Sequence, residues 1–166
     1  METVYIETSI VSHATARPSS DIQISAIQHQ ARTWWSAERP NFELVTSQLV
    51  IDEAAAGDPS AAADRLRLLN GLATVPINDE VRSLARAILS ASIMPAKAAA
   101  DALHVAAAAV AGVQYLLTLN CKHIANAHEL PRVYRLLDNQ GYGRLLICTP
   151  AEFLGGDNAH DKESDS

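Results

Sequence analysis

Cysteine is rare in this sequence: Cys121 and Cys148 are the only two among 166 residues. Two isolated cysteines build no disulfide framework and no CxxC pair, so we expect reduced thiols and a cytoplasmic protein. The first residues lack the basic stretch and apolar run of a signal peptide. The most apolar segment, residues 98–113, contains Asp101 and His104 and is too short and too polar to span a membrane.

Positive charge is also scarce. Thirteen lysines and arginines stand against 19 acidic residues, and the formal net charge is −6. This balance argues against binding nucleic acid through bulk positive charge. It does not exclude a nuclease, because a metal-dependent nuclease needs local carboxylates. A partner or a second subunit would then help to supply basic surface.

Aromatic residues make up only 5% of the chain, whereas apolar residues make up 48%, with alanine prominent. Alanine favours helix, and this apolar content is enough for the core of one domain of this length. Short β-prone runs alternate with helical segments. The predicted strands cover residues 4–6, 42–47, 73–77, 115–119 and 145–148. The predicted helices cover residues 21–38, 48–56, a segment from 59, 78–92, 97–111 and 130–140.

This alternation predicts an α/β fold, a three-layer α/β/α sandwich around a mostly parallel sheet of four to five strands. We expect one domain over residues 1–154 and a polar, disordered tail over 155–166. In such folds, ligands bind at the carboxyl ends of the strands.

Four polar residues are expected at that edge of the sheet. Glu7 and Asn120 directly follow strands, and Glu53 and Asp101 lie on helices that follow loops on the same side. Three carboxylates in one place repel one another, which raises their pKa values unless a cation is present. A hard divalent ion resolves this conflict, and Mg²⁺ typically takes a few carboxylates and keeps several waters. The pattern therefore predicts a Mg²⁺ pocket suited to attack of water on a phosphate ester.

Each of these residues also has a structural explanation. Glu7 fits a solvated acid at a strand end, Glu53 fits the acid preference near a helix start, and Asn120 fits a turn. Asp101 is the hardest to explain in this way, because it interrupts an apolar helix face that rarely tolerates an unpaired carboxylate. We expect Asp52, beside Glu53, to be exposed.

Three basic side chains lie near these residues in the sequence. His104 is one turn from Asp101. This position fits pairing with that acid or contact with substrate, but the favoured interpretation is a satisfied structural histidine. Lys122 and His123 follow Asn120 closely. They fit phosphate contacts and loop surface equally well.

Several segments occur in a definite order and spacing over about residues 3 to 154. They are Val4-Tyr5-Ile6-Glu7-Thr8-Ser9, Val50-Ile51-Asp52-Glu53-Ala54 with Gly57-Asp58 after it, Asp101-Ala102-Leu103-His104-Val105-Ala106, and Leu116-Leu117-Thr118-Leu119-Asn120 continued by Cys121-Lys122-His123-Ile124-Ala125-Asn126. No single segment is specific, but the ordered set is. It resembles the PIN-domain ribonucleases and, within them, the VapC-type toxins of bacterial type II toxin–antitoxin pairs.

The resemblance implies a Mg²⁺- or Mn²⁺-dependent endoribonuclease. The positions that fall on the family's acidic metal site are Glu7, Glu53, Asp101 and, as the fourth, Asn120. Thr8 or Ser9 falls on the hydroxyl that supports the first acid. The resemblance further implies an RNA substrate, a small antitoxin that blocks the pocket with a basic side chain, and a homodimer with two pockets along a shared groove.

Two positions depart from the family pattern. The first acid is usually aspartate, but here it is Glu7, whose extra methylene requires a backbone shift or one fewer metal-bound water. The fourth acid is replaced by Asn120, which can ligate through its carbonyl oxygen or hold a water but adds no charge. We therefore expect one well-formed metal site and a weak or absent second site.

These departures and the low basicity keep a second hypothesis open, a PIN-like RNA- or protein-binding module that has lost catalysis. A third hypothesis is a structure-specific DNA nuclease acting in repair. The short chain counts against the third, because it leaves no room for a separate DNA-clamping region.

Overall fold

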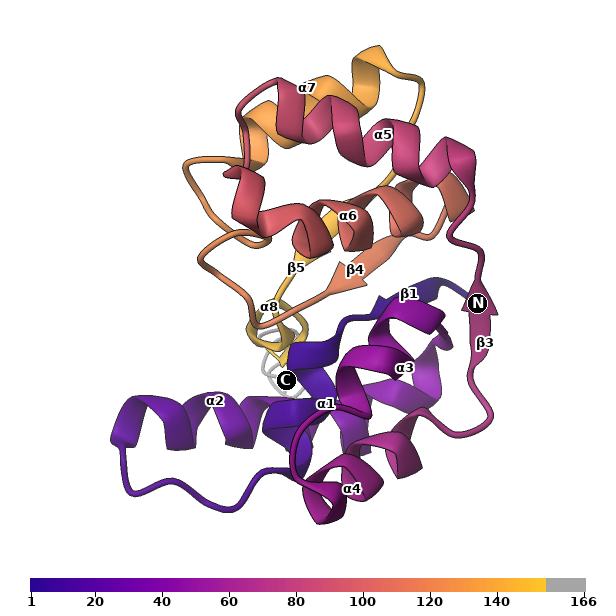
Figure 1. Cartoon of the computed structure of the whole chain (residues 1–166). Coiled ribbons are helices and arrows are strands. Elements are labelled where there is room, and N and C mark those ends of the chain that lie inside the picture. The colour runs from indigo at the N-terminus through magenta and orange to yellow at the C-terminus, as the bar shows by residue number, and fades with distance from the viewer. Residues whose placement is uncertain (155–166) are drawn as a thin grey trace, which may run out of the picture.

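The computed structural model describes residues 1–154, in which a five-stranded sheet lies among helices (Figure 1). All strand pairs are parallel, and the strand order is β3-β2-β1-β4-β5. The strands are β1 (Thr3–Ile6), β2 (Glu43–Ser47), β3 (Ala73–Val75), β4 (Tyr115–Leu117) and β5 (Leu146–Cys148). The predicted α/β class and parallel sheet are therefore confirmed.

Helices connect these strands throughout the described residues. The α-helices are α1 (Thr8–Thr15), α2 (Ile22–Thr33), α3 (Gln48–Ala54), α4 (Pro59–Leu69), α5 (Asp79–Ser90), α6 (Ala99–Ala111), α7 (Leu130–Asn139) and α8 (Pro150–Leu154). The π-helix η1 (Trp34–Glu38) and the 3₁₀ turns η2 (Arg39–Asn41) and η3 (Ala96–Ala98) complete the set. Within residues 1–154, no helix combines the length and the apolar character needed to cross a membrane.

The direction in which strands are added reverses at β1. The chain first moves outward from β1 to β2 and β3, and then returns to place β4 and β5 on the other side of β1. Because parallel crossovers are right-handed, the connections of the two halves cover opposite faces of the sheet. In Figure 1, α1, α3 and α4 accordingly lie apart from α5, α6 and α7. The carboxyl ends of β1 and β4 meet at the switch point, where ligands bind in such folds.

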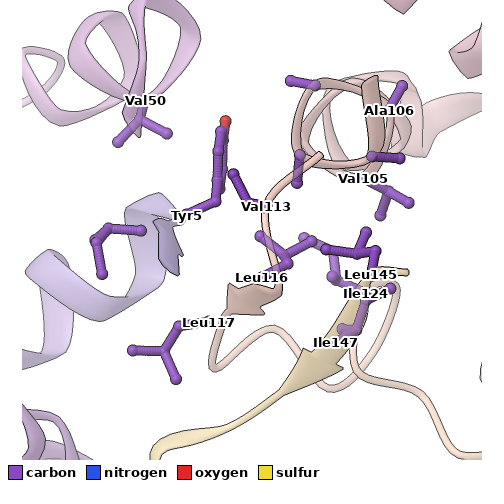
Figure 2. Packing of buried hydrophobic residues seen from close by; sticks show 14 of the residues in the cluster. Tyr5, Val50, Val105, Ala106, Val113, Leu116, Leu117, Ile124, Leu145 and Ile147 are labelled. Carbon is purple, nitrogen blue, oxygen red and sulfur yellow. The ribbon is translucent and has the colours of Figure 1, made fainter. Parts of the chain in front are cut away.

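Strand β1 lies in the middle of the core. Val4, Tyr5 and Ile6 are fully buried, and Tyr5 is in register with Leu116 of β4. Figure 2 shows the Tyr5 ring standing away from Leu117, with its hydroxyl in the space between the helices of Val50 and Val105. An apolar central strand of this kind is expected where both faces of a parallel sheet are covered, but the buried phenol needs a polar partner.

Helix α1 is an element that the sequence pattern does not predict. Its first residues include the β-branched Thr8, Ile10 and Val11, which are poor helix formers. Two tertiary features override that preference. Glu7 caps the helix by accepting the Ser9 N–H at 2.9 Å, and Ile10 and Val11 are fully buried. Short helix α8 was likewise not expected.

The helix predicted over residues 21–38 divides into α2 and the π-helix η1. At the transition, the Ser36 hydroxyl donates to the carbonyls of Arg32 and Thr33. Such bonds from a hydroxyl to the preceding turn often bend a helix, and π-helix occurs mostly as single turns within α-helices. The predicted disordered tail, residues 155–166, lies outside the described residues.

Candidate active site

The structure places the four residues singled out by sequence at the carboxyl edge of the sheet. Glu7 caps α1 directly after β1, and Glu53 lies in the last turn of α3. Asp101 lies in the first turn of α6, and Asn120 follows β4. Glu7 is only 5% exposed, whereas the other three are partly exposed. Asp52 is exposed, as expected from its position beside Glu53.

The Glu7 carboxylate accepts three hydrogen bonds. The Ser9 and Thr118 hydroxyls both donate to Oε1 at 2.5 Å, and the Ser9 N–H donates to Oε2 at 2.9 Å. The same two hydroxyls accept backbone N–H groups, that of Leu119 at 2.8 Å and that of Asn120 at 3.0 Å. Glu7 thus ties the end of β1 to the end of β4. Of the two hydroxyls predicted to support the first acid, Ser9 makes the contact.

Glu53 is held through one of its two carboxylate oxygens. Thr8 Oγ1 donates to Glu53 Oε1 at 2.6 Å, and His104 Nε2 lies 2.7 Å from the same oxygen. Burial raises the pKa of Glu53, but the His104 hydrogen bond and charge, with the Thr8 hydroxyl, outweigh it and leave the pKa lowered. Crowding alone predicted raised pKa values for all three acids, and for Glu53 that was wrong. His104 pairs with Glu53 rather than with Asp101. Both of its ring nitrogens have partners at a buried position, which agrees with the favoured interpretation of a satisfied structural histidine.

Asp101 is held by the amide of Asn120. Asn120 Nδ2 donates to Asp101 Oδ1 at 3.1 Å, and the His123 backbone N–H donates to Asn120 Oδ1 at 3.1 Å. The pKa of Asp101 is raised, mainly by burial and further by the Glu7 charge, although His123, His104 and the Asn120 amide oppose the shift. Burial and the Glu7 charge therefore outweigh the groups that stabilise the ionised form of Asp101.

The three carboxylates lie at one edge of the sheet without meeting at a single point. Across residues 1–154, no three Asp, Glu, His or Cys side chains are close enough together to hold one ion. The donor set nevertheless suits a hard divalent ion, which prefers carboxylate oxygens. Among the described residues, no hydrogen bond reaches Oε2 of Glu53 or Oδ2 of Asp101, so each acid presents one anionic oxygen. That all four residues are ligands stays a prediction.

Two residues that the sequence analysis did not single out take part in this site. Thr118 is fully buried and links Glu7 to the Asn120 backbone. Tyr5 is fully buried and lies 2.9 Å from His104 Nδ1 through its hydroxyl. The available signal was the same for both, a hydroxyl within an otherwise apolar strand segment, because a buried hydroxyl requires a partner.

Lys122, the predicted phosphate contact, is exposed beside this edge. Its backbone carbonyl accepts from Asn126 Nδ2 at 3.0 Å, which fixes the loop while the ammonium group stays in solvent. The side chain therefore remains compatible with both interpretations, a phosphate contact and plain loop surface.

Comparison with known proteins agrees with this fold. The PIN domain family model matches residues 4–129, which contain β1 through β4 and all four candidate residues. The search of curated proteins found no match. PIN domains are generally nucleases, and PIN nucleases generally use divalent metals. Because the match covers most of the chain and the five-stranded parallel sheet is consistent with the PIN fold, the protein belongs to the PIN-domain family.

Proposed function

We propose that this PIN domain is a Mg²⁺- or Mn²⁺-dependent endoribonuclease, and that it is the VapC-like toxin of a type II toxin–antitoxin pair acting in the cytoplasm. The observation that carries the proposal is a pair of carboxylate oxygens at the switch point beside Glu7, Glu53 Oε2 and Asp101 Oδ2, neither of which accepts a hydrogen bond from residues 1–154. Such oxygens at the carboxyl edge of a parallel sheet are the donors that a phosphodiesterase metal requires.

Glu53 and Asp101 are the residues that would hold the metal, with Glu7 adding negative charge and possible direct ligation. When bound, the ion would supply an activated water and neutralise phosphate charge. The chain's own residues orient the donors: Thr8 fixes Glu53, and Asn120 fixes Asp101. The Asn120 oxygen already accepts the His123 N–H, so in this arrangement Asn120 supports Asp101 rather than acting as an independent ligand.

The proposal requires a basic side chain near the site that can contact RNA. A hollow of about 550 Å³ lies between the end of α1 and the start of α4, and its lining includes Ser12, two arginines (Arg17 and Arg65) and two aspartates (Asp58 and Asp64). Ser12 is one helical turn from Thr8, so the hollow lies on the face of α1 that carries Thr8. Arg65 donates to backbone carbonyls, whereas no hydrogen bond engages the Arg17 guanidinium within residues 1–154. Arg17 is therefore the group that we expect to contact an RNA phosphate.

An antitoxin and a homodimer belong to the same proposal. A basic side chain of an antitoxin would find the Glu53 and Asp101 oxygens as acceptors and would compete with a metal there. A small protein with a DNA-binding N-terminal half, encoded immediately upstream, would support the toxin assignment. Co-expression of that protein should restore growth of cells that express this chain.

The activity is tested by incubating the purified protein with RNA in Mg²⁺ or Mn²⁺. We expect cleavage that EDTA stops and that Asp101→Asn abolishes. Asp52→Asn is the matched control, because Asp52 is an exposed acid next to Glu53 whose side chain, among the described residues, accepts a hydrogen bond only from Gln48. Full cleavage by Asp101→Asn would refute the assigned site, and preferential cutting of flapped DNA would favour the repair-nuclease hypothesis.

A binding module without catalysis is the second candidate. The observation in its favour is that Glu7 uses both carboxylate oxygens in hydrogen bonds and that the acids do not converge. Calorimetric titration with Mn²⁺ separates the two candidates. Absence of binding at millimolar Mn²⁺, with RNA or partner binding intact, would favour the module.

A further inference from the structure

A chain of hydrogen-bonding groups leads from the core of the sheet to Glu53. Ser47 Oγ lies 2.7 Å from the Tyr5 hydroxyl, and that hydroxyl lies 2.9 Å from His104 Nδ1. His104 Nε2 lies 2.7 Å from Glu53 Oε1. The four residues come from β2, β1, α6 and α3, so the contacts join elements that are far apart in the sequence.

Three members of this chain are removed from solvent. Tyr5 and Ser47 are 0% exposed and His104 is 1% exposed. Figure 2 shows the Tyr5 hydroxyl in the space between the helix that carries Val50 and the helix that carries Val105. Polar groups in such surroundings are costly unless each is hydrogen-bonded. Apolar residues would fill the same space at no such cost, which indicates that the polar chain serves the site at its end.

For a neutral imidazole at His104, the direction of every bond in the chain follows from its end at Glu53. An ionised carboxylate only accepts, so His104 Nε2 carries the hydrogen. In the neutral imidazole Nδ1 then accepts, which makes the Tyr5 hydroxyl its donor. The Tyr5 oxygen in turn accepts from the Ser47 hydroxyl. Burial is the largest cause of the raised pKa of Tyr5, so the phenol stays protonated and able to donate.

The consequence for Glu53 is a fixed division between its two oxygens. Oε1 is occupied by His104 and Thr8, whereas Oε2 meets no donor in the described part of the chain. We propose that Tyr5 and His104 are positioning residues that lock the imidazole tautomer and hold Glu53 so that Oε2 faces the cation. This inference rests on the proposed function, because it assumes that Glu53 serves a metal.

Metal affinity in the absence of RNA is the direct test. Loss of an outer partner of a metal ligand typically weakens metal binding ten- to hundredfold. We expect His104→Leu to weaken Mn²⁺ binding by about that factor in calorimetric titration. His104→Gln should recover much of the affinity, because its amide N–H replaces the Nε2 donor. Tyr5→Phe should weaken binding by a smaller factor, since it frees the tautomer without removing the donor to Glu53.

The matched control is Tyr134→Phe. The Tyr134 hydroxyl also bonds within the fold, to the backbone of Ile147 at 2.8 and 3.3 Å, but it lies at the sheet edge away from Glu53. That variant should lose stability without losing Mn²⁺ affinity.

Nitrogen-15 NMR of the wild-type imidazole at mildly alkaline pH should show the Nε2–H tautomer for His104. The Nδ1–H tautomer, or a mixture, would overturn the inference.

The outcomes for the inference and for the function can be told apart. Suppose that the wild type cuts RNA, and that every variant that folds, among His104→Gln, Tyr5→Phe and His104→Leu, binds Mn²⁺ as tightly as the wild type. The positioning role then fails, and the nuclease function stands. If the wild type binds Mn²⁺ without cutting RNA and the variants weaken that binding, the role stands and the nuclease function fails. In RNA cleavage, the positioning role predicts a fall in kcat at saturating RNA with little change in KM. A change in KM alone would contradict it.

Discussion

The hydrogen bond from Thr118 to Glu7 offers a sharp test of how this edge is held together. Thr118→Val keeps the shape of the side chain and removes its hydroxyl. That hydroxyl donates to Glu7 Oε1 at 2.5 Å and accepts the Asn120 N–H at 3.0 Å, at a fully buried position. A hydrogen bond to a charged group contributes about 1.5–3 kcal/mol, and the unpaired N–H adds to the loss. We expect the free energy of unfolding to fall by about 2–4 kcal/mol.

Thr46→Val is the matched control. Thr46 is also a fully buried strand threonine, but its hydroxyl donates to the neutral Ile6 carbonyl at 3.2 Å. The expected loss there is about 0.5–1.5 kcal/mol. Urea denaturation of both variants in EDTA gives the comparison, provided that the m-value is unchanged. If Thr118→Val costs no more than Thr46→Val, Glu7 does not depend on Thr118 and the proposed tie between β1 and β4 is incorrect.

Further predictions address charge, backbone, substrate and metal. Because the pKa of Glu53 is lower in the folded protein, the ionised side chain stabilises the fold at pH values above the unfolded pKa. This stabilisation is lost as the pH falls through the folded pKa. Glu53→Gln should therefore destabilise the protein in EDTA at neutral pH. The pKa of Asp101 is raised in the folded protein, so its ionised form destabilises the fold at neutral pH. Asp101→Asn should therefore slightly raise the melting temperature in EDTA while cleavage is lost, and a lower melting temperature would contradict this. Gly112 ends α6 at φ +71°, so Gly112→Ala should cost about 1–2 kcal/mol in urea denaturation, and no loss would contradict the left-handed cap. Arg17→Ala should weaken RNA binding and reduce the slope of log affinity against log salt concentration by about 1. Arg144→Ala, before the amino end of β5, should leave both the affinity and the slope unchanged. Mn²⁺ at 100 times its dissociation constant should stabilise the wild type by about 2.7 kcal/mol, and an unchanged melting temperature would count against a metal site.

Local side-chain chemistry accounts for most of the fold that was predicted. Asp21, Ser47 and Asp58 belong to the residue types that favour helix caps, and each accepts the backbone N–H of the residue three positions after it. Helix α1 escaped prediction because its cap is a glutamate, a residue outside the usual capping set. The contact that holds that glutamate comes from Thr118, 111 positions away, and no local pattern can show it.

In the candidate site too, some features could be predicted from local sequence and others depend on distant contacts. Asp101 could be predicted because a carboxylate in an alanine-rich helix needs a reason, and the structure supplies the Asn120 amide as its partner. The pairing of His104 could not be predicted, because the choice between Asp101 and Glu53 depends on where α3 ends relative to α6. Spacing along one helix offered only Asp101 as a partner, and the packing of two helices places Glu53 there instead.

The neutral residue at position 120 bears on how many metal ions the site would hold. Asn120 donates to Asp101 Oδ1, which a carboxylate at the same position could not do. Aspartate there would instead add a charge beside Asp101, whose pKa burial and Glu7 already raise, and a second cation would be needed to offset it. The amide removes that need and orients Asp101 without a second ion. Under the proposed nuclease function, the departure at Asn120 therefore favours one tightly held metal over a site that has merely lost one of two.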